Sequence, residues 1–160
     1  MERTSQRYVP IALIAVAVLL LAARVASHFV APAASKTSLI RWLTPEEGMA
    51  LAANSTRPVL LDFTADWCAP CHVLDAEVFR DPALARVISE RFIPVRVVDR
   101  KREEGRNRPI VDELQQRFTV SAFPTVLFVD GDGNVRGRME GFHGKLEFER
   151  IMEQAREQIR

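Results

Sequence analysis

Residues 62–71 read DFTADWCAPC, and within this stretch an apolar strand gives way to a helix that opens on two cysteines. The strand is predicted from residues 58–64, a short apolar run that begins with a proline. The helix is predicted over residues 69–79. Cys68 and Cys71 are separated by two residues at the helix start, a spacing that lets their sulfurs form one disulfide.

The two cysteines are not equivalent. Cys68 stands at the N-terminus of the predicted helix, where unpaired N–H groups and the helix dipole stabilise a thiolate. Cys71 lies one turn further on, on the same face as Leu74 and Val78, and is expected to point into the core. We therefore expect Cys68, open to partners, to attack a disulfide, and Cys71, sheltered behind it, to resolve the mixed disulfide.

The cysteine motif also allows three other interpretations. Followed by His72, it matches the attachment pattern of a c-type haem, but the preceding apolar strand and the strand-rich remainder fit haem poorly. A structural zinc site needs four ligands, and the sequence has no second C-x-x-C. A purely structural disulfide would close too short a loop to add much stability. The sequence favours a redox-active pair that needs no metal or cofactor.

Strand and helix patterns alternate beyond this motif and predict the α/β class, with a mixed central sheet flanked by helices. Thr44, Pro45 and Glu47 have the spacing of a capping box with proline at the first helical position. The charged residues 100–108 are interpreted as a solvated loop. Helices are expected at residues 44–54, 69–79, 81–91, 109–118 and 145–158, and strands at residues 58–64, 92–99, 125–130 and 135–141.

The first thirty residues differ from the rest of the chain. Residues 1–8 are polar and basic, and residues 11–23 are apolar without a break. This pattern is typical of export, and as a helix the apolar run is about 20 Å long against a hydrocarbon core of roughly 30 Å. Residues 1–30 are expected to form a cytoplasmic stub with a hydrophobic membrane anchor helix or a signal peptide, residues 31–38 a linker, and residues 39–160 the folded domain.

Composition and charge narrow the class of protein. A chain of 160 residues, 48% of them hydrophobic, is expected to fold as one globular domain. Residues 37–160 hold 18 basic and 20 acidic side chains, so they offer no basic surface for nucleic acid. Two cysteines cannot make a disulfide framework, so a hydrophobic core must hold the fold together.

The residues around the cysteines resemble the thioredoxin superfamily. The resemblance rests on residues 62–71 and on the Phe-Pro-Thr motif at residues 123–125. Together with VFRDP at residues 78–82, these motifs are similar, within the superfamily, to the C-terminal periplasmic domain of the membrane thiol–disulfide reductase DsbD. The likeness extends over residues 57–152 and implies a thioredoxin-like fold with thiol–disulfide oxidoreductase activity.

This resemblance assigns catalytic roles to five residues. Cys68 and Cys71 correspond to the redox pair, and Pro124 corresponds to the cis proline that faces the pair and hydrogen-bonds the substrate backbone. Asp62 corresponds to a buried acid that assists proton movement at the inner thiol. Asp75 corresponds to a second acid that raises the thiol pKa.

Two aromatic residues are expected to bind substrate, namely Trp67 beside the nucleophile and Phe123 before the proline. Three of the seven assignments have ordinary structural alternatives. Asp62 would then be an edge residue facing water, Asp75 a solvated helix acid and Trp67 a packing residue.

Taken together, the sequence predicts an exported oxidoreductase that reduces disulfides of periplasmic proteins, apocytochromes c among them. The expected location is the periplasmic face of the inner membrane, through the N-terminal helix, or the periplasm after signal cleavage. Electrons are expected from a membrane reductase, because DsbD's own membrane domain has no counterpart in these 160 residues. A disulfide donor and a non-catalytic thioredoxin-fold chaperone or cytochrome c assembly factor remain alternatives.

Overall fold

The computed structural model describes residue 16 and residues 38–159. The expected N-terminal hydrophobic helix and the expected linker lie outside the described residues, apart from Val16 and Ser38. Within the described ranges, no helix has both the length and the apolar character needed to cross a membrane. The chain divides into the units Met1–Thr37 and Ser38–Arg160, and the fold described below is that of the second unit.

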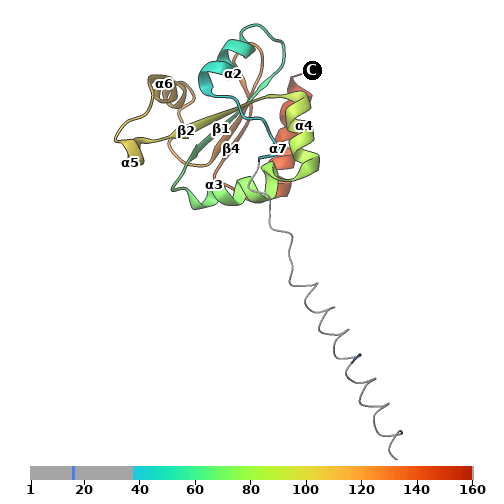
Figure 1. Ribbon diagram of the computed structural model, residues 1–160. Helices are drawn as coiled ribbons and strands as arrows, with labels where there is room; N and C mark the ends of the chain where they lie inside the picture. The colour runs from blue at the N-terminus through green and yellow to red at the C-terminus, as the bar shows by residue number, and fades with distance from the viewer. Residues whose placement is uncertain (1–15, 17–37, 160) are drawn as a thin grey trace, which may run out of the picture. The chain divides into compact units, whose positions relative to one another are not determined.

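Within residues 38–159, each helix and strand expected from the sequence is present, with small differences in bounds (Figure 1). In chain order the elements are α2 (Pro45–Ala52), β1 (Val59–Ala65), α3 (Ala69–Leu74), η1 (Asp75–Phe79), α4 (Pro82–Arg91), β2 (Ile93–Asp99), α5 (Lys101–Glu104), α6 (Pro109–Arg117), β3 (Thr125–Val129), β4 (Val135–Glu140) and α7 (Lys145–Gln158).

The four strands form one mixed sheet in the order β2-β1-β3-β4. Strands β1 and β2 are parallel, whereas β3 is antiparallel to both β1 and β4. A short bridge from Leu43 to Val95 covers part of the free edge of β2. The central place of β1 means that the residues at its carboxyl end lie between β2 on one side and β3 on the other.

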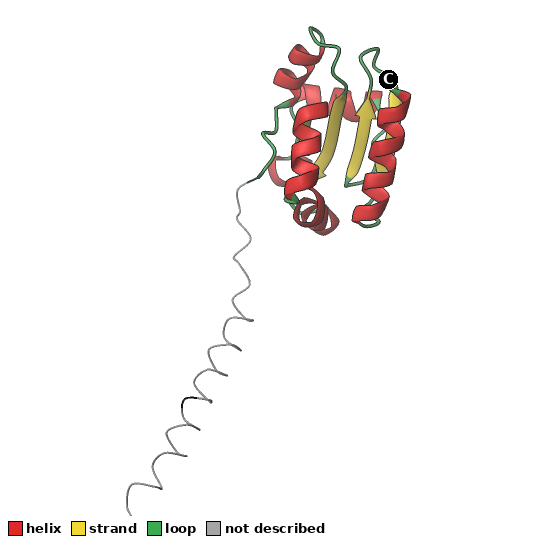
Figure 2. Ribbon diagram, turned by 90° about the vertical axis from the view of Figure 1, so that its right-hand side faces the viewer, coloured by secondary structure: helices red, strands yellow, loops and turns green. Residues whose placement is uncertain are grey.

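Helices cover both faces of the sheet (Figure 2). Leu60, Val126 and Phe128 pack on the face shared with α3, η1, α4 and α7. The neighbouring residues Leu61 and Leu127 point to the opposite face, which packs against α2 and α6. This alternation follows from the two-residue period of a strand, and each fully buried side chain of this size contributes about 1.5–3 kcal/mol. The two hydrophobic cores hold the carboxyl end of β1 in place.

The capping box predicted at the start of α2 is present. The hydroxyl of Thr44 accepts a hydrogen bond from the N–H of Glu47, and the Glu47 carboxylate accepts one from the N–H of Thr44. Along the same helix, Gly48 lies so close to β2 that a Cβ at this position would come within 2.1 Å of Val95 Cγ2. Glycine therefore allows α2 to pack directly on the sheet.

Two segments differ from the sequence prediction. The helix expected over residues 69–79 is α-helical only to Leu74 and continues as the π-helix η1, in which the N–H of Arg80 donates to the carbonyl of Asp75. Residues 100–108 were expected to be a solvated loop, but Lys101–Glu104 form the short helix α5. A run of charges does not reveal such a turn, because the backbone at its start is held by the side chains of Asp99 and Asn107.

Candidate active site

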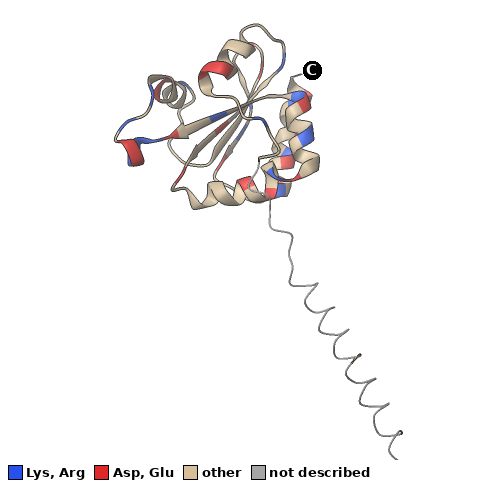
Figure 3. Ribbon diagram, in the orientation of Figure 1, with Lys and Arg blue, Asp and Glu red and all other residues tan. Residues whose placement is uncertain are grey.

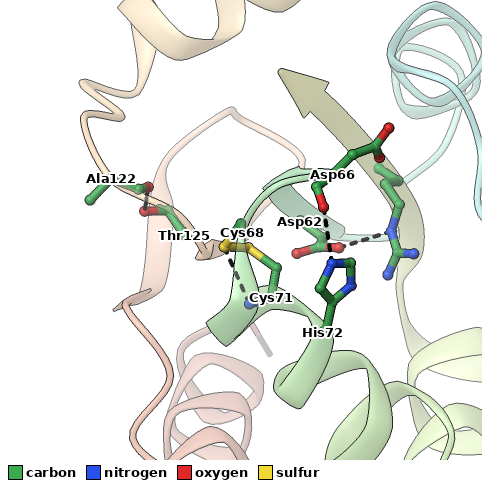
Figure 4. The surroundings of a disulfide bond; sticks show 8 residues. Asp62, Asp66, Cys68, Cys71, His72, Ala122 and Thr125 are labelled. Carbon is green, nitrogen blue, oxygen red and sulfur yellow. Dashed lines mark hydrogen bonds and ion pairs between the residues drawn. A yellow bond between two sulfur atoms is a disulfide. The ribbon is translucent and has the colours of Figure 1, made fainter. Parts of the chain in front are cut away.

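Cys68 and Cys71 lie at the carboxyl end of β1, where α3 begins, and are joined by a disulfide (Figure 4). The S–S distance is 2.03 Å and the Cα atoms are 5.3 Å apart. Cys68 is the N-cap of α3, and its Sγ accepts a hydrogen bond of 3.2 Å from the N–H of Cys71. The same N–H also donates to the carbonyl of Cys68 at 3.1 Å, so a first-turn donor of the helix lies against the sulfur on which a thiolate would form.

Both sulfurs are sheltered. The exposed fraction is 2% for Cys68 and 5% for Cys71, so the expectation that Cys68 lies open to partners was wrong for this state. Phe123 packs against the small cluster of Ala65 and the two cysteines. Its ring meets the edge of Trp67 at a centroid distance of 6.0 Å, while Trp67 itself remains 46% exposed. Phe123 therefore covers part of the pair, and Trp67 packs against Phe123.

The Phe-Pro-Thr motif leads into β3, the strand next to β1, which begins at Thr125, and this pairing brings the motif to the cysteines. The peptide bond between Phe123 and Pro124 is cis, as the resemblance implied. The hydroxyl of Thr125 donates to the carbonyl of Ala122 at 2.8 Å, which fixes the turn (Figure 4). Proline has no N–H, and the carbonyl of Pro124 already accepts from Gly141 at 2.7 Å.

Asp62 is buried in the central strand β1, with an exposed fraction of 2%, so the alternative of an edge residue facing water was wrong. Its Oδ2 accepts a hydrogen bond of 2.9 Å from Nε of Arg96, whereas its Oδ1 has no partner within the described part of the chain. Burial raises the pKa of Asp62 to about 6, against the opposing effect of the Arg96 charge. Figure 4 shows the carboxyl on the side of the sheet that α3 covers. A carboxyl of this pKa can exchange a proton near neutral pH.

Asp75 lies at the start of η1 and is joined to the same arginine. Its Oδ1 accepts from Nη2 of Arg96 at 2.5 Å, and its side chain is 29% exposed. Asp75 is thus a partly exposed acid that is ion-paired with Arg96. The negative charge of Asp75 is one of the factors that raise the pKa of Asp62.

Arg96 is the functional residue that the sequence reasoning missed. It is the register partner of Asp62 on β2, and its guanidinium lies over the ring of Trp42 at 4.2 Å from the centroid. The ring of Phe79 lies 5.5 Å from the same group. A signal was present in the sequence, since Arg96 interrupts the otherwise apolar strand at residues 93–98. A single charge in a buried strand requires a partner.

Charged and polar side chains surround the entrance to the pair. His72 Nε2 lies 3.0 Å from the carbonyl oxygen of Asp66, and the Asp66 carboxylate forms an ion pair with Arg100. The guanidinium of Arg102 lies 5.4 Å from the centroid of the Trp67 ring. Trp67 thus packs between Phe123 on one side and Arg102 on another, a more elaborate setting than simple core packing.

The chemistry available here is thiol–disulfide exchange. Within residues 16 and 38–159, no three His, Cys, Asp or Glu side chains are grouped to hold a metal ion. The site instead combines a cysteine pair at a helix N-terminus, a neighbouring buried carboxyl and a cis-proline turn. These parts can supply a nucleophile, a resolving thiol and a proton acceptor.

Comparison with known proteins gives the same picture. The model of the thioredoxin-like domain family matches residues 45–156. The thiol:disulfide interchange protein DsbD of Vibrio vulnificus is 34% identical over 113 residues, which are 68% of this chain and 18% of that protein. DsbD of Actinobacillus pleuropneumoniae is 34% identical over 94 residues, 58% of this chain and 15% of that protein. The chain thus spans less than a fifth of the length of these relatives.

Solved structures share the fold. The oxidised C-terminal domain of DsbD from Neisseria meningitidis has a TM-score of 0.53 and 28% identity, covering 69% of this chain and 90% of that one. A thioredoxin from Thermus thermophilus has a TM-score of 0.58 and 28% identity, covering 74% and 85%. The oxidoreductase DsbH has a TM-score of 0.61 at 19% identity, covering 79% and 90%, and shows the similarity of fold alone.

Proposed function

The chain belongs to the thioredoxin-like domain family, and from this premise we propose that it is a thiol–disulfide oxidoreductase that reduces disulfides of exported proteins. The observation that carries the proposal is the Cys68–Cys71 pair at the N-terminus of α3, next to the cis-proline turn and above a buried carboxyl. The resemblance to the C-terminal domain of the reductase DsbD, found in the sequence and supported by the similarity to DsbD proteins, favours reduction as the direction.

The first step is attack by the Cys68 thiolate on one sulfur of the partner's disulfide. A mixed disulfide forms between Cys68 and the partner, and the partner's second sulfur leaves as a thiolate that takes up a proton. The attacking thiolate is stabilised by the N–H of Cys71 and by the N-terminus of α3. Phe123, which packs against the pair, must move aside for this step, because Cys68 is only 2% exposed.

The second step releases the reduced partner. Cys71 gives up its proton and attacks Sγ of Cys68, which restores the disulfide and frees the partner's first sulfur as a thiolate. We assign the proton to Asp62, whose pKa of about 6 suits a base near neutral pH. The thiolate that leaves in this step takes up the proton that Asp62 received from Cys71, and the thiolate of the first step takes one from water. In sum, two electrons pass from the cysteine pair to the partner's disulfide.

Pro124 holds the turn that faces the pair rather than supplying a hydrogen bond itself. It has no N–H, and its carbonyl is already engaged by Gly141. We therefore propose that the backbone of Phe123, rather than that of Pro124, forms the hydrogen bonds with the partner protein. The ring of Phe123 also contacts the cysteine cluster.

The setting proposed for this reaction is the periplasm. A membrane reductase would return the pair to its dithiol form, and disulfide proteins, apocytochromes c among them, would be the substrates. Residues 1–30 would serve as an anchor or signal peptide, residues 31–38 as a linker, and residues 39–160 as the catalytic domain. Mass spectrometry of the mature N-terminus distinguishes an anchor from a cleaved signal.

Reduction of insulin disulfides by the purified chain tests the activity. We expect turnover with dithiothreitol as the electron source, a loss of turnover in Cys68→Ser, and a trapped mixed disulfide in Cys71→Ser. Equal turnover in the native chain and Cys68→Ser would refute the proposal. The reduction potential, measured against glutathione, decides the direction. A value near −270 mV favours a reductase, whereas a value near −120 mV would identify a disulfide donor.

A further inference from the structure

Residues 100–108, called the α5 segment below, contain helix α5 and lie beside the entrance to the cysteine pair. The segment has a net charge of +3, whereas the rest of residues 37–160 has a net charge of −5. Figure 3 shows its charged residues on and around α5, at the margin of the fold. Two contacts join it to the active site, namely the ion pair of Arg100 with Asp66 and the approach of Arg102 to Trp67. Both contacted residues immediately precede Cys68.

A buried polar network holds the α5 segment in place. Asn107 is only 8% exposed, and its Nδ2 donates to Asp99 at 2.7 Å and to Asp112 at 3.0 Å. Its Oδ1 accepts from the N–H of Arg100 at 2.6 Å. A buried network with its groups satisfied fixes one conformation, and a segment with only a solvating role would not require it. The position of the segment beside Trp67 is therefore specified by the fold.

One cation of this segment faces the active site without an ionic partner. Three others are paired within the domain, Arg100 with Asp66, Lys101 with Asp112 and Arg108 with Glu46. Arg102 is exposed, and across residues 38–159 it has no carboxylate within salt-bridge distance. A guanidinium that lies over an aromatic ring keeps its N–H groups free for a carboxylate.

We propose that Arg102 binds an acidic side chain close to the disulfide of the protein that this chain reduces. Preferred partners then carry Asp or Glu within a few residues of the attacked cysteine, and opposite charge both speeds the encounter and selects the partner. This inference rests on the proposed function, because it names the partner chemistry for the same cysteine pair. It adds a specificity residue that lies outside the cysteine and proline motifs.

The test uses the full-length chain with Cys71→Ala, so that reaction stops at the mixed disulfide. Three peptides carry one cysteine, activated as its 2-pyridyl disulfide and flanked by two Asp, two Lys or two Ser residues. The Cys68 thiolate attacks the peptide sulfur, and pyridine-2-thione leaves with the electrons of the broken bond. Its absorbance gives the rate, and rates with the charged peptides are divided by the rate with the Ser peptide.

We expect the acidic peptide to react about three- to fivefold faster than the basic one at low salt, the size of effect typical of an exposed ion pair. The ratio of the rate with the acidic peptide to the rate with the basic peptide should approach 1 at high ionic strength, because salt screens exposed charges. Arg102→Gln should lower the ratio, and Arg102→Glu should invert it. Arg86→Glu, a charge reversal at an exposed arginine on α4, is the matched control and should keep the original ratio.

The outcomes separate this inference from the proposed function. A fast reaction with the Ser peptide and equal rates for the two charged peptides would overturn the inference alone. So would a preference for acid that survives Arg102→Glu. A rate with the Ser peptide no higher than that of free cysteine at the same pH would instead count against the oxidoreductase site itself, and with it the inference.

Discussion

Arg96 donates a hydrogen bond of 2.9 Å from Nε to Oδ2 of Asp62, its register partner across the parallel strands β2 and β1. The same guanidinium donates from Nη2 to Asp75 at 2.5 Å. One permanent cation therefore holds two carboxylates behind the cysteine pair. At Asp62 the cation favours the ionised form while burial opposes it, and burial is the larger effect.

The first prediction concerns Asp62 and the dependence of stability on pH. Because burial raises the pKa of Asp62 from 3.8 to about 6, the folded protein binds this proton more tightly than the unfolded chain. Stability is therefore lost as the pH rises from 4 to 6, by up to about 3 kcal/mol. We expect Asp62→Asn to unfold at a higher urea concentration than the native chain at pH 8.

The same measurement at low pH supplies the control. At pH 3.5, below the ordinary pKa of 3.8, Asp62 is mostly protonated in both the folded and the unfolded chain, so the advantage of Asp62→Asn should largely disappear there. An advantage of equal size at pH 3.5 and pH 8 would mean that the substitution acts through packing, and the assignment of a raised pKa would fail.

The second prediction concerns Arg96 and the titration of Asp62. Arg96→Met removes the cation that favours the ionised form, so the pKa of Asp62 should rise above 6. Arg96→Lys keeps a charge but offers no planar fork for two carboxylates, so its effect should be intermediate. The carboxyl carbon of Asp62, followed by NMR against pH, measures this directly. An unchanged or lowered midpoint in Arg96→Met would contradict the role assigned to Arg96, and Arg86→Met serves as control.

The third prediction concerns Gly48 in helix α2. Replacing a helical glycine by alanine ordinarily stabilises an exposed helix by about 1 kcal/mol. Here the added Cβ would come within 2.1 Å of Val95 Cγ2, a buried side chain of β2 with little freedom to move. We expect Gly48→Ala to lower the free energy of unfolding by about 1–3 kcal/mol. Gly131→Ala, where a Cβ meets nothing within 4 Å, is the matched control. A stabilised Gly48→Ala would show that α2 can shift away from the sheet.

The fourth prediction concerns Asn107, which ties the α5 segment to β2. Asn107→Ala removes the donor to the buried carboxylate of Asp99 and the acceptor for the N–H of Arg100. A loss of about 1–3 kcal/mol is expected from such unsatisfied groups. Hydrogen exchange should increase selectively in residues 100–106, with the strands unaffected. Uniform acceleration across the domain, or none, would contradict a local fixing role.

The sequence was informative where pattern and chemistry coincide. The two cysteines and the apolar run before them predicted the strand–helix junction, because an apolar run and the cysteine spacing are local features. The resemblance supplied Pro124 and Asp62, whose proximity to the pair depends on β1 lying between β2 and β3. No local signal sets that order, which arises from the pairing of strands far apart in the chain.

The features that escaped prediction are those created by tertiary contacts. Arg96 belongs to the site only because strand register places it beside Asp62. Helix α5 looked like a solvated charge run, since its fixation comes from Asn107 and Asp99 eight residues apart. The shelter of Cys68 was likewise invisible, because it comes from Phe123, which follows it by more than fifty positions.

The disulfide links two residues only three positions apart, and neither cysteine belongs to the two large hydrophobic cores. Reducing the bond releases a loop of only a few residues, so the domain does not have to unfold or refold when the pair is reduced or oxidised. The bond can therefore be reduced and formed again many times while the two hydrophobic cores stay packed. Substitutions close to the two cysteines can then change the reduction potential of the pair while the rest of the domain keeps its fold.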